Sequence, residues 1–358
     1  MPVPVRRACG PWPTIAAMSV PSLPFPHTGV AAATTGHRQV LIPYAAMTGV
    51  DWQHQGQPLK LPQLDAVLAR LAAADTLSGD EDDLSPPHER MAALWRGWAD
   101  LAATRNISLP WAALAAASRP DCAQGGTAGG SWAFMSPSHW TAGADQIRMD
   151  NPADLQLDEA DSRALLALLS PWFAEDGFHL HYERPDRWLV HGPALQALQS
   201  AALDRVLLRD VRHWQPDAGQ NRTLQRLHSE VQMLLYTHAF NDRRAERGQL
   251  PVNAFWLYGA GALPASRAPV LSPNPEVWGQ LRTPALTGSH DSWLQAWVDL
   301  DAGPMADLLR HLHNGGTATL ALCGERSARS FTTAPRSLGQ RIQGIFKPQR
   351  FGSFREAL

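Results

Sequence analysis

The stretch Pro251-Val-Asn-Ala-Phe-Trp-Leu-Tyr-Gly-Ala-Gly261 is the segment that decides the fold class. Its apolar run ends at two glycines, which predicts a buried strand over Pro251–Tyr258 followed by a sharp turn. Upstream, leucines and Val231 recur at helical spacing and predict a long helix over Arg222–Phe240. A long helix shortly before a buried strand is typical of an α/β layered fold.

Strands and helices continue to alternate on both sides of this segment. Phe178–Glu183 and Arg187–Val190 alternate apolar and polar residues around Arg184-Pro-Asp186, which predicts a hairpin. The alternation as a whole predicts an α/β protein with a mixed sheet flanked by helices. Further strands are predicted over Gln39–Tyr44, Ser131–Met135 and Thr317–Cys323. Further helices are predicted to begin near Leu61, at Pro87 with an apolar face that reaches Leu101, at Asp158, and at Ser292 with a break at Gly303-Pro304 before the helix resumes to His313.

Composition excludes several classes of protein. The chain has 358 residues, of which 44% are hydrophobic and 18% charged, with a formal net charge of -2. That apolar content is enough for a substantial core and argues against a mainly disordered chain or a coiled coil. A near-neutral charge argues against non-specific nucleic-acid binding, which needs a basic surface. No apolar run reaches the roughly 20 residues that cross a bilayer, so neither nucleic acid nor a membrane is an expected partner.

Cysteine usage and the ends of the chain give further expectations. Cys9, Cys122 and Cys323 are far apart and form no CxxC pair, so a reducing cytoplasm is expected rather than a disulfide framework or a thiolate zinc site. Prolines interrupt residues 1–37, which predicts a disordered N-terminal extension. One α/β domain is predicted over 38–336, with a possible lobe boundary near the glycine-rich stretch 124–130, followed by a C-terminal tail of weak pattern over 337–358.

Tryptophan is unusually frequent among the aromatic side chains, with 14 residues against 10 phenylalanines and 4 tyrosines. The functional interpretation is a stacking surface for bases or sugars. Trp256 differs from the others because it stands in a predicted strand beside a glycine turn. Tryptophans on apolar helix faces are instead expected to anchor the core, and these are Trp98, Trp172, Trp293 and Trp297.

Several short motifs match metal or cofactor sites only in part. His88-Glu89 matches the start of a zinc-protease helix, but Ala92 stands where the second histidine belongs. Gly259-Ala-Gly261 is half of a dinucleotide fingerprint, with Pro264 in place of the third glycine. The sequence therefore predicts no bound metal and no cofactor. Two pairs of histidines lack an identifiable third ligand, namely His179 with His181 and His311 with His313.

One group of polar residues lies close in sequence to the glycine turn. His238, Arg243 and Asn253 together offer the side chains that hold an anion. A polar residue such as Asn253 within a buried strand also needs a partner or a ligand. The structural alternative is that Asn253 caps a loop and Arg243 pairs with Asp242 or Glu246. From the residues alone, the two interpretations have equal weight.

The stretch from His238 to Pro264 resembles archaeal-type, cofactor-independent phosphoglycerate mutases. Those enzymes carry a His-Pro-x-Asn-x-x-Arg run, a Gly-Lys-x-Pro-x-Asn step and a Trp-Leu-Trp-Gly-x-Gly strand end. With the helix after Asp158 and the hairpin before Val190, the resemblance covers roughly the middle third of the chain. It implies a phosphoglycerate-mutase-like fold of the alkaline phosphatase superfamily, truncated relative to the enzymes. The matching segments are His238-Ala-Phe-Asn241 with Arg244, Gly248-Gln-Leu-Pro-Val-Asn253 and Trp256-Leu-Tyr-Gly-Ala-Gly261.

Residues Val40 to Arg336 also resemble a group of bacterial proteins, the RpfE-type regulatory proteins. Four segments carry this resemblance, at Ser85–Glu89, Ser229–Met233, Asn253–Leu257 and Leu322–Arg326. Together with the mutase resemblance, they imply two sets of candidate site residues. The ligand-binding candidates are Arg187, His238, Asn241, Arg243, Arg244, Asn253, Trp256, Gly259 and Gly261. The other candidates are His88, Glu89, Glu325 and Arg326.

The chain departs from the mutase pattern where those enzymes bind two metal ions and place a serine nucleophile. Their first metal-binding aspartate follows the first strand, whereas this chain has Ile42-Pro-Tyr44 there. Their last core strand ends in Asp-His-Ser, and here it ends in Gly324-Glu-Arg326. Phosphoryl displacement is very slow without help, and paired metals stabilise both of its oxygens. The resemblance therefore implies a mutase-like scaffold, a pseudoenzyme without catalytic residues.

Three functions follow as expectations. The first is a non-catalytic cytoplasmic protein with a regulatory or metabolite-sensing role, which binds a phosphorylated or carboxylate metabolite through the candidate arginines. The alternative is an active metal-dependent phosphoglycerate mutase or phosphatase with an unusual site, built on His179 and His181 or on the acidic run from Asp80. The third is a scaffold for a protein partner, which requires a large exposed apolar patch.

Overall fold

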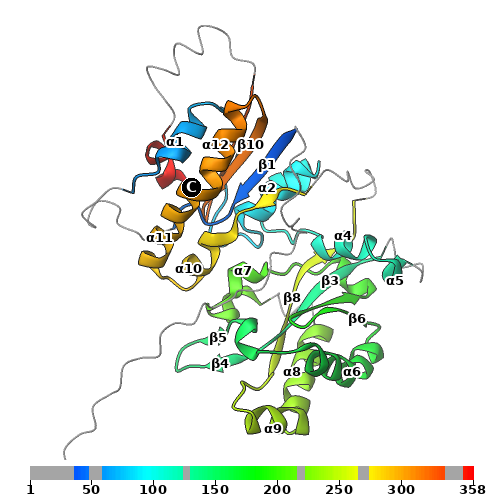
Figure 1. Cartoon of the computed structure of the whole chain (residues 1–358). Coiled ribbons are helices and arrows are strands. Elements are labelled where there is room, and N and C mark those ends of the chain that lie inside the picture. Colours follow the sequence, from blue (N-terminus) through cyan, green and yellow to red (C-terminus); the bar gives the residue numbers. More distant parts are fainter. Residues whose placement is uncertain (1–35, 48–58, 124–129, 216–221, 265–273, 335–349) are drawn as a thin grey trace, which may run out of the picture.

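The computed structural model describes residues 36–47, 59–123, 130–215, 222–264, 274–334 and 350–358. In this part of the chain, helices pack on two main β-sheets, which form the two halves of the molecule (Figure 1). The predicted α/β class with a mixed sheet flanked by helices is confirmed. Most of the predicted N-terminal extension lies outside the described residues, at 1–35. The same holds for the glycine-rich stretch 124–129 and for residues 335–349.

The first half contains a five-stranded mixed sheet in the order β2-β11-β10-β1-β9. Strand β1 runs parallel to both of its neighbours, whereas the pairs β10–β11 and β11–β2 are antiparallel. The sheet combines strands from both ends of the sequence. These strands are β1 (His37–Ile42), β2 (Ala72–Leu77), β9 (Glu276–Val277), β10 (Thr317–Cys323) and β11 (Ala328–Thr332). The helices of this half are α1 (Pro62–Leu68), α2 (Pro87–Trp95), α3 (Ala99–Ala103), α10 (Arg282–Leu286), α11 (His290–Leu300) and α12 (Ala306–His313).

The second half comes from the middle of the chain and contains an antiparallel sheet in the order β6-β7-β3-β8. Its strands are β3 (Trp132–Ser138), β6 (His179–Arg184), β7 (Arg187–His191) and β8 (Ala254–Gly261), with a small separate sheet of β4 (Trp140–Ala142) and β5 (Ile147–Met149). Its helices are α4 (Trp111–Ala117), α5 (Pro120–Ala123), α6 (Glu159–Glu175), α7 (Leu203–Val206), α8 (Arg222–Tyr236) and α9 (Ala239–Glu246). Short 3₁₀ segments occupy Pro152–Leu155, Pro193–Gln196, Val211–Trp214, Gly279–Leu281, Phe351–Ser353 and Arg355–Ala357.

The four-stranded sheet is buried on both faces. Successive residues of a strand point to opposite sides, so one strand contributes to two cores. Met135 of β3 belongs to the core that α6 and α8 cover. Its neighbour Phe134 belongs to a second core, which includes Trp111 of α4 and continues to the five-stranded sheet. This second core joins the two halves.

Three of the four tryptophans expected in the core are buried there. Trp293 and Trp297 are 0% exposed and Trp98 is 5% exposed. The prediction for Trp172 is wrong, because this side chain is 37% exposed. The buried stripe of α6 runs through Leu165, Leu169 and Phe173. Trp172 stands one position away from that stripe, which rotates its side chain about 100° toward solvent.

The structure corrects three predicted helices. The helix predicted over Arg222–Phe240 ends at Tyr236, and α9 begins after His238, whose Nδ1 accepts a hydrogen bond from the Phe240 amide at 3.1 Å. The predicted helix from Pro87 to Leu101 is divided at Gly97, which has a positive φ of 79°. The predicted break at Gly303-Pro304 is wrong, since the helix continues through a π-helical turn over Asp301–Met305. Proline has no amide hydrogen to donate to the helix, and the wider π-helical turn tolerates Pro304 at this position.

Residues 350–358, in the predicted C-terminal tail, pack against the first half. Phe351 and Phe354 are buried, and their rings lie 5.3 Å from those of Trp297 and Phe331, respectively. The main-chain oxygen of Leu358 accepts hydrogen bonds from the amides of Arg326 and Ser327. Within the described ranges, no helix has both the length and the apolar character needed to cross a membrane.

Candidate functional site

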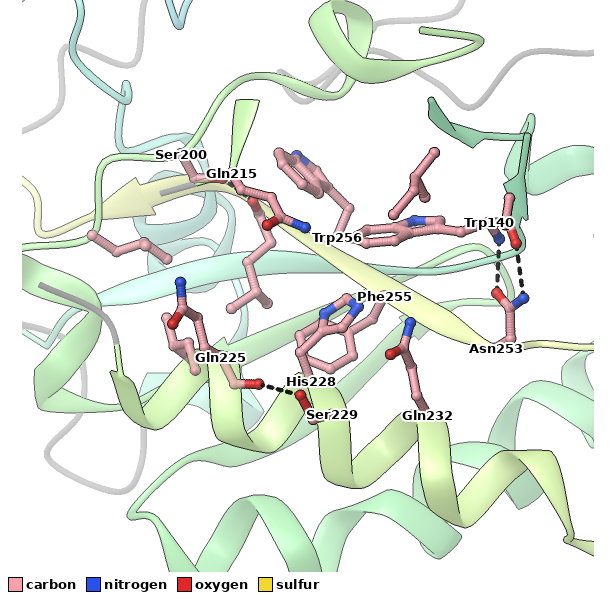
Figure 2. A pocket seen from close by; sticks show the side chains of 15 residues that line it. Trp140, Ser200, Gln215, Gln225, His228, Ser229, Gln232, Asn253, Phe255 and Trp256 are labelled. Atoms are coloured by element: carbon pink, nitrogen blue, oxygen red, sulfur yellow. Dashed lines mark hydrogen bonds between the residues drawn. The ribbon is translucent and has the colours of Figure 1, made fainter. Parts of the chain in front are cut away.

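A cavity of about 580 Å³ opens between helix α8, strand β8 and the small β4–β5 sheet (Figure 2). We call it the aromatic pocket. Its volume lies in the range of ordinary small-molecule sites. The side chains from the described residues that line it are uncharged types. Four carry rings (Trp140, His228, Phe255 and Trp256), six are polar (Ser200, Gln215, Gln225, Ser229, Gln232 and Asn253), and the others are aliphatic.

Helix α8 forms one wall of this pocket because it carries two different faces. Leu227, Val231 and Leu235 are buried against the four-stranded sheet. The neighbouring face carries Gln225 and Gln232 on either side of His228, spaced three and four residues apart. Side chains at this spacing line up along a helix, and Figure 2 shows them directed into the pocket.

The ring of His228 lies between two aromatic rings. Its centroid is 4.5 Å from that of Trp140 and 4.8 Å from that of Phe255. The Trp140 ring is in turn 6.2 Å from the ring of Trp256. The indole nitrogen of Trp256 donates to the carbonyl oxygen of Ala201 at 2.9 Å, which fixes that ring. The pocket therefore has a continuous aromatic wall.

Two polar ring atoms of this wall are buried without a hydrogen-bond partner among the described residues. They are Nε2 of His228 and Nε1 of Trp140. Burial lowers the pKa of His228 to about 4, so its imidazole is neutral at physiological pH. Leaving a buried donor or acceptor unpaired costs about 1–3 kcal/mol. Both atoms have almost no accessible surface, so they do not face the open space of the cavity.

Asn253 holds Trp140 in place and lines the pocket. Its side-chain oxygen accepts from the Trp140 amide at 2.7 Å, and its side-chain nitrogen donates to the Trp140 carbonyl at 2.9 Å (Figure 2). Asn253 and Trp256 are the two sequence-derived candidates that the structure brings to this pocket. The structural interpretation of Asn253 also holds in part, because its side-chain amide is hydrogen-bonded to the main chain of Trp140.

Two other candidates hold the loop between α8 and β8. His238 caps the N-terminus of α9. Asn241 donates to the carbonyl oxygens of Leu235 and Val252 and accepts from the Val252 amide, each within 2.9 Å. These bonds use the polar groups expected to hold an anion, so both side chains have a structural role.

Arg187, Gly259 and Gly261 lie on the four-stranded sheet. Arg187 forms a bidentate pair with Glu183, at 2.8 and 2.6 Å, and its guanidinium lies over the Phe134 ring. The glycines have positive φ values of 63° and 136°. A Cβ at Gly259 would lie 3.1 Å from the Phe134 ring. The turn that resembled half of a dinucleotide site therefore serves close packing.

Arg244 is fully buried, whereas its neighbour Arg243 is exposed. Arg244 donates to the carbonyl oxygens of Leu250, at 2.8 Å, and Leu155. Among the described residues, the expected pairing of Arg243 with Asp242 or Glu246 is not formed. The two adjacent arginines therefore differ in role, and Arg244 holds the main chain together.

We expect Arg244→Met to lower the free energy of unfolding by about 2 kcal/mol, because two carbonyl oxygens lose their donor. Arg243→Met is the matched control and is expected to change it by no more than about 0.5 kcal/mol. Urea unfolding of both variants measures the difference. Equal effects would show that the buried contacts of Arg244 contribute little.

A buried charged cluster lies where the two halves meet. Its centre is Asp204 of α7, which accepts hydrogen bonds from Arg282 of α10, with Nε 3.0 and 2.9 Å from the two carboxylate oxygens. Tyr44, after β1, donates to the same carboxylate at 3.2 Å, and Nε2 of His88 lies 3.3 Å from it. Beside them, Glu89 accepts from the indole nitrogen of Trp111 at 3.2 Å. We call these groups the Asp204 cluster; they link elements of both halves.

Burial sets the charge states within the Asp204 cluster. Burial and the nearby Asp204 carboxylate raise the pKa of Glu89 to about 8, so Glu89 is protonated at neutral pH. Burial alone would raise the pKa of Asp204, but Arg282 and His88 hold it below its ordinary value. Burial lowers the pKa of His88. The cluster at neutral pH is thus an ionised Asp204–Arg282 pair surrounded by neutral partners.

Comparisons with known proteins find distant structural similarity. No family model matches the chain, and no curated protein matches it. Among solved structures, it is similar to a cofactor-independent phosphoglycerate mutase from Thermoplasma acidophilum, at 16% identity and a TM-score of 0.33, covering 84% of this chain and 91% of that one. It is also similar to the PH0037 protein from Pyrococcus horikoshii, at 11% identity and a TM-score of 0.40, covering 84% and 88%. The resemblance is distant. No role of any residue in this chain rests on it.

The remaining candidates lie away from the aromatic pocket. Glu325 pairs with Arg209 at 3.2 Å, and the side chain of Arg326 is exposed. His179 and His181 line a second, smaller cavity with His191, and the rings of His179 and His191 are 6.2 Å apart. In the described ranges, no group of three or more histidine, cysteine or acidic side chains is arranged to hold a metal ion.

Sequence reasoning missed most of the aromatic pocket. Trp140 and His228 were not singled out, although a signal for His228 exists in α8. There, Gln225, His228 and Gln232 form a polar stripe beside the apolar one, and this stripe contains no charge. A helix face that is polar but uncharged is unusual for a solvated surface and could have indicated a lined cavity.

Proposed function

We propose that this protein is a non-catalytic small-molecule-binding protein with a sensing or regulatory role, and that its ligand binds in the aromatic pocket. The observation that supports this most strongly is a cavity of about 580 Å³ whose described lining combines four rings with three glutamine side chains and carries no ionised group. Ligand sites are typically apolar cavities with a few polar groups that lack other partners. The regulatory part of the proposal draws on the resemblance to RpfE-type proteins.

The lining of the pocket favours an uncharged ligand over the phosphorylated or carboxylate metabolite expected from sequence. No arginine or lysine is among the described residues that line it. An anion moved out of water needs a compensating positive charge or several donors. Of the arginines among the ligand-binding candidates, Arg187 is paired with Glu183, and Arg244 is fully buried. The anion hypothesis would have to use the exposed Arg243.

A thermal-shift and calorimetric screen tests the proposal. Uncharged metabolites and 3-phosphoglycerate are tested separately against the full chain. A ligand at 100 times its Kd stabilises the folded state by about 2.7 kcal/mol, which is a readily measured shift in Tm. We expect a shift with an uncharged compound. If only 3-phosphoglycerate binds, or if nothing in a broad screen binds, the proposed site is wrong.

Two variants of α8 locate the binding site. Gln232→Glu adds a negative charge at the pocket, on an exposed position where the fold tolerates it. We expect this variant to bind the ligand at least tenfold more weakly. Tyr236→Ala is the matched control, because Tyr236 is 87% exposed on the same helix and lies outside the pocket lining. Turnover of phosphoglycerate by the purified protein with zinc or manganese would overturn the non-catalytic part of the proposal.

A further inference from the structure

We propose that the ligand of the aromatic pocket is an uncharged, planar nitrogen heterocycle of the nucleobase type. This inference rests on the proposed function and adds the chemical class of the ligand. It is carried by three features of the lining, namely its rings, its unpaired side-chain amides and the absence of ionised groups from the described residues that line it.

The rings provide a stacking surface. Trp140, His228 and Phe255 form a contiguous series with centroid separations of 4.5 and 4.8 Å, and Trp256 lies beside it. Stacking of a base on an aromatic side chain contributes about 1–3 kcal/mol and requires a flat partner. An aliphatic ligand would bury the same area without this contribution.

The glutamines provide the hydrogen-bonding groups. Gln215, Gln225 and Gln232 line the pocket, and within the described residues none of their side-chain amides makes a hydrogen bond. Figure 2 shows the amides of Gln225 and Gln232 directed from α8 toward the ring side of the pocket. An amide offers a donor and an acceptor side by side, and this arrangement pairs with the donor–acceptor edge of a heterocycle such as adenine.

The same lining disfavours the two closest alternatives. Sugars present many hydroxyl donors, which bind most strongly to ionised carboxylates, and no aspartate or glutamate is among the described residues that line the pocket. Phosphorylated compounds would bring a charge into a site whose described lining contains no arginine or lysine. Only the neutral, flat class uses the rings and the glutamine amides together.

Isothermal titration of the full chain with matched probes tests the inference. The probes are adenosine, guanosine, uridine, ribose, glucose and adenosine monophosphate. We expect at least one nucleoside to bind, with quenching of tryptophan fluorescence because the base stacks on the indole wall. Ribose and glucose are expected not to bind. The monophosphate of a nucleoside that binds is expected to bind at least tenfold more weakly than the nucleoside.

Variants of helix α8 test whether the nucleoside binds in the aromatic pocket. Gln232→Ala is expected to weaken nucleoside binding about five- to tenfold, and Tyr236→Ala is expected to leave it unchanged. Binding of a sugar but of no nucleoside would overturn the heterocycle while leaving the proposed function in place. Failure of every probe in this set and in the wider screen would overturn both. Nucleoside binding that Gln232→Ala and Gln225→Ala leave unchanged would overturn the assignment to this pocket.

Discussion

Replacement of Asp204 by alanine is expected to lower the free energy of unfolding by about 3–5 kcal/mol. The substitution leaves Arg282, which is 5% exposed, as a buried charge without its bidentate partner. It also removes the acceptor for the Tyr44 hydroxyl and the carboxylate near His88. Because these partners come from several elements of the first half and Asp204 comes from the second, the change loosens the junction between the halves. Equilibrium unfolding in urea measures it.

Two controls distinguish the cost of leaving a buried charge unpaired from the cost of losing any ion pair. Asp307→Ala breaks the pair with Arg310, in which both side chains are more than half exposed, and is expected to cost no more than about 1 kcal/mol. The double variant Asp204→Leu with Arg282→Met removes both buried charges, and we expect it to be more stable than Asp204→Ala. A loss below 1 kcal/mol for Asp204→Ala would contradict the role of the cluster as a link.

Replacement of Glu89 by glutamine is expected to make the protein less sensitive to alkaline pH. The folded pKa of Glu89 is about 8, above its ordinary value of 4.5, so folding takes up a proton between these values. The stability that the protonated side chain contributes is complete below pH 4.5, falls as pH rises, and is lost above pH 8. Glutamine resembles the protonated acid and has no such dependence. Each unit of pKa difference corresponds to about 1.4 kcal/mol, so the two proteins should diverge by several kcal/mol from pH 5 to pH 8.

The measurement is urea unfolding of both proteins at half-unit pH steps. The neighbouring Asp204, Arg282, His88 and Tyr44 are present in both proteins, so their titration largely cancels in the difference. Glu159→Gln, at an exposed position of α6, is the matched control and should leave the pH profile unchanged. A constant difference between Glu89→Gln and the natural chain at every pH would mean that Glu89 is ionised in the folded protein.

The sequence predicted elements whose own residues carry a strong pattern. The hairpin of β6 and β7 was found from its period-two alternation, and α6 from its N-cap, where Asp158 accepts from the Asp161 amide at 2.7 Å. Strands β2 and β11 were missed. Strand β2 is short, alanine-rich and largely exposed, and it forms because the edge of β11 offers hydrogen bonds. Such a strand is specified by its neighbour rather than by its own pattern.

The site was less predictable than the fold because residues near in sequence proved to have different roles. Arg243 and Arg244 are adjacent, yet one is exposed and the other is fully buried. The aromatic pocket instead joins Trp140, His228 and Phe255, which only the folded sheet and helix bring together. The Asp204 cluster likewise depends on long-range contacts, since Tyr44 and Arg282 reach the same carboxylate from distant positions. No local motif encodes these contacts.

The pairing of β1 with β10 has a consequence for how the chain acquires its structure during translation. His37 pairs with Thr317, so β1 leaves the ribosome long before β9 and β10, its two neighbours, have been synthesised. The four-stranded sheet, in contrast, draws on contiguous sequence from Trp132 to Gly261 and can assemble while synthesis continues. We expect that, in nascent chains from which Gly261 has emerged from the ribosome, the second half resists proteolysis while the first half remains sensitive. Strand β1 therefore cannot pair with β10 until the chain has been synthesised through Cys323.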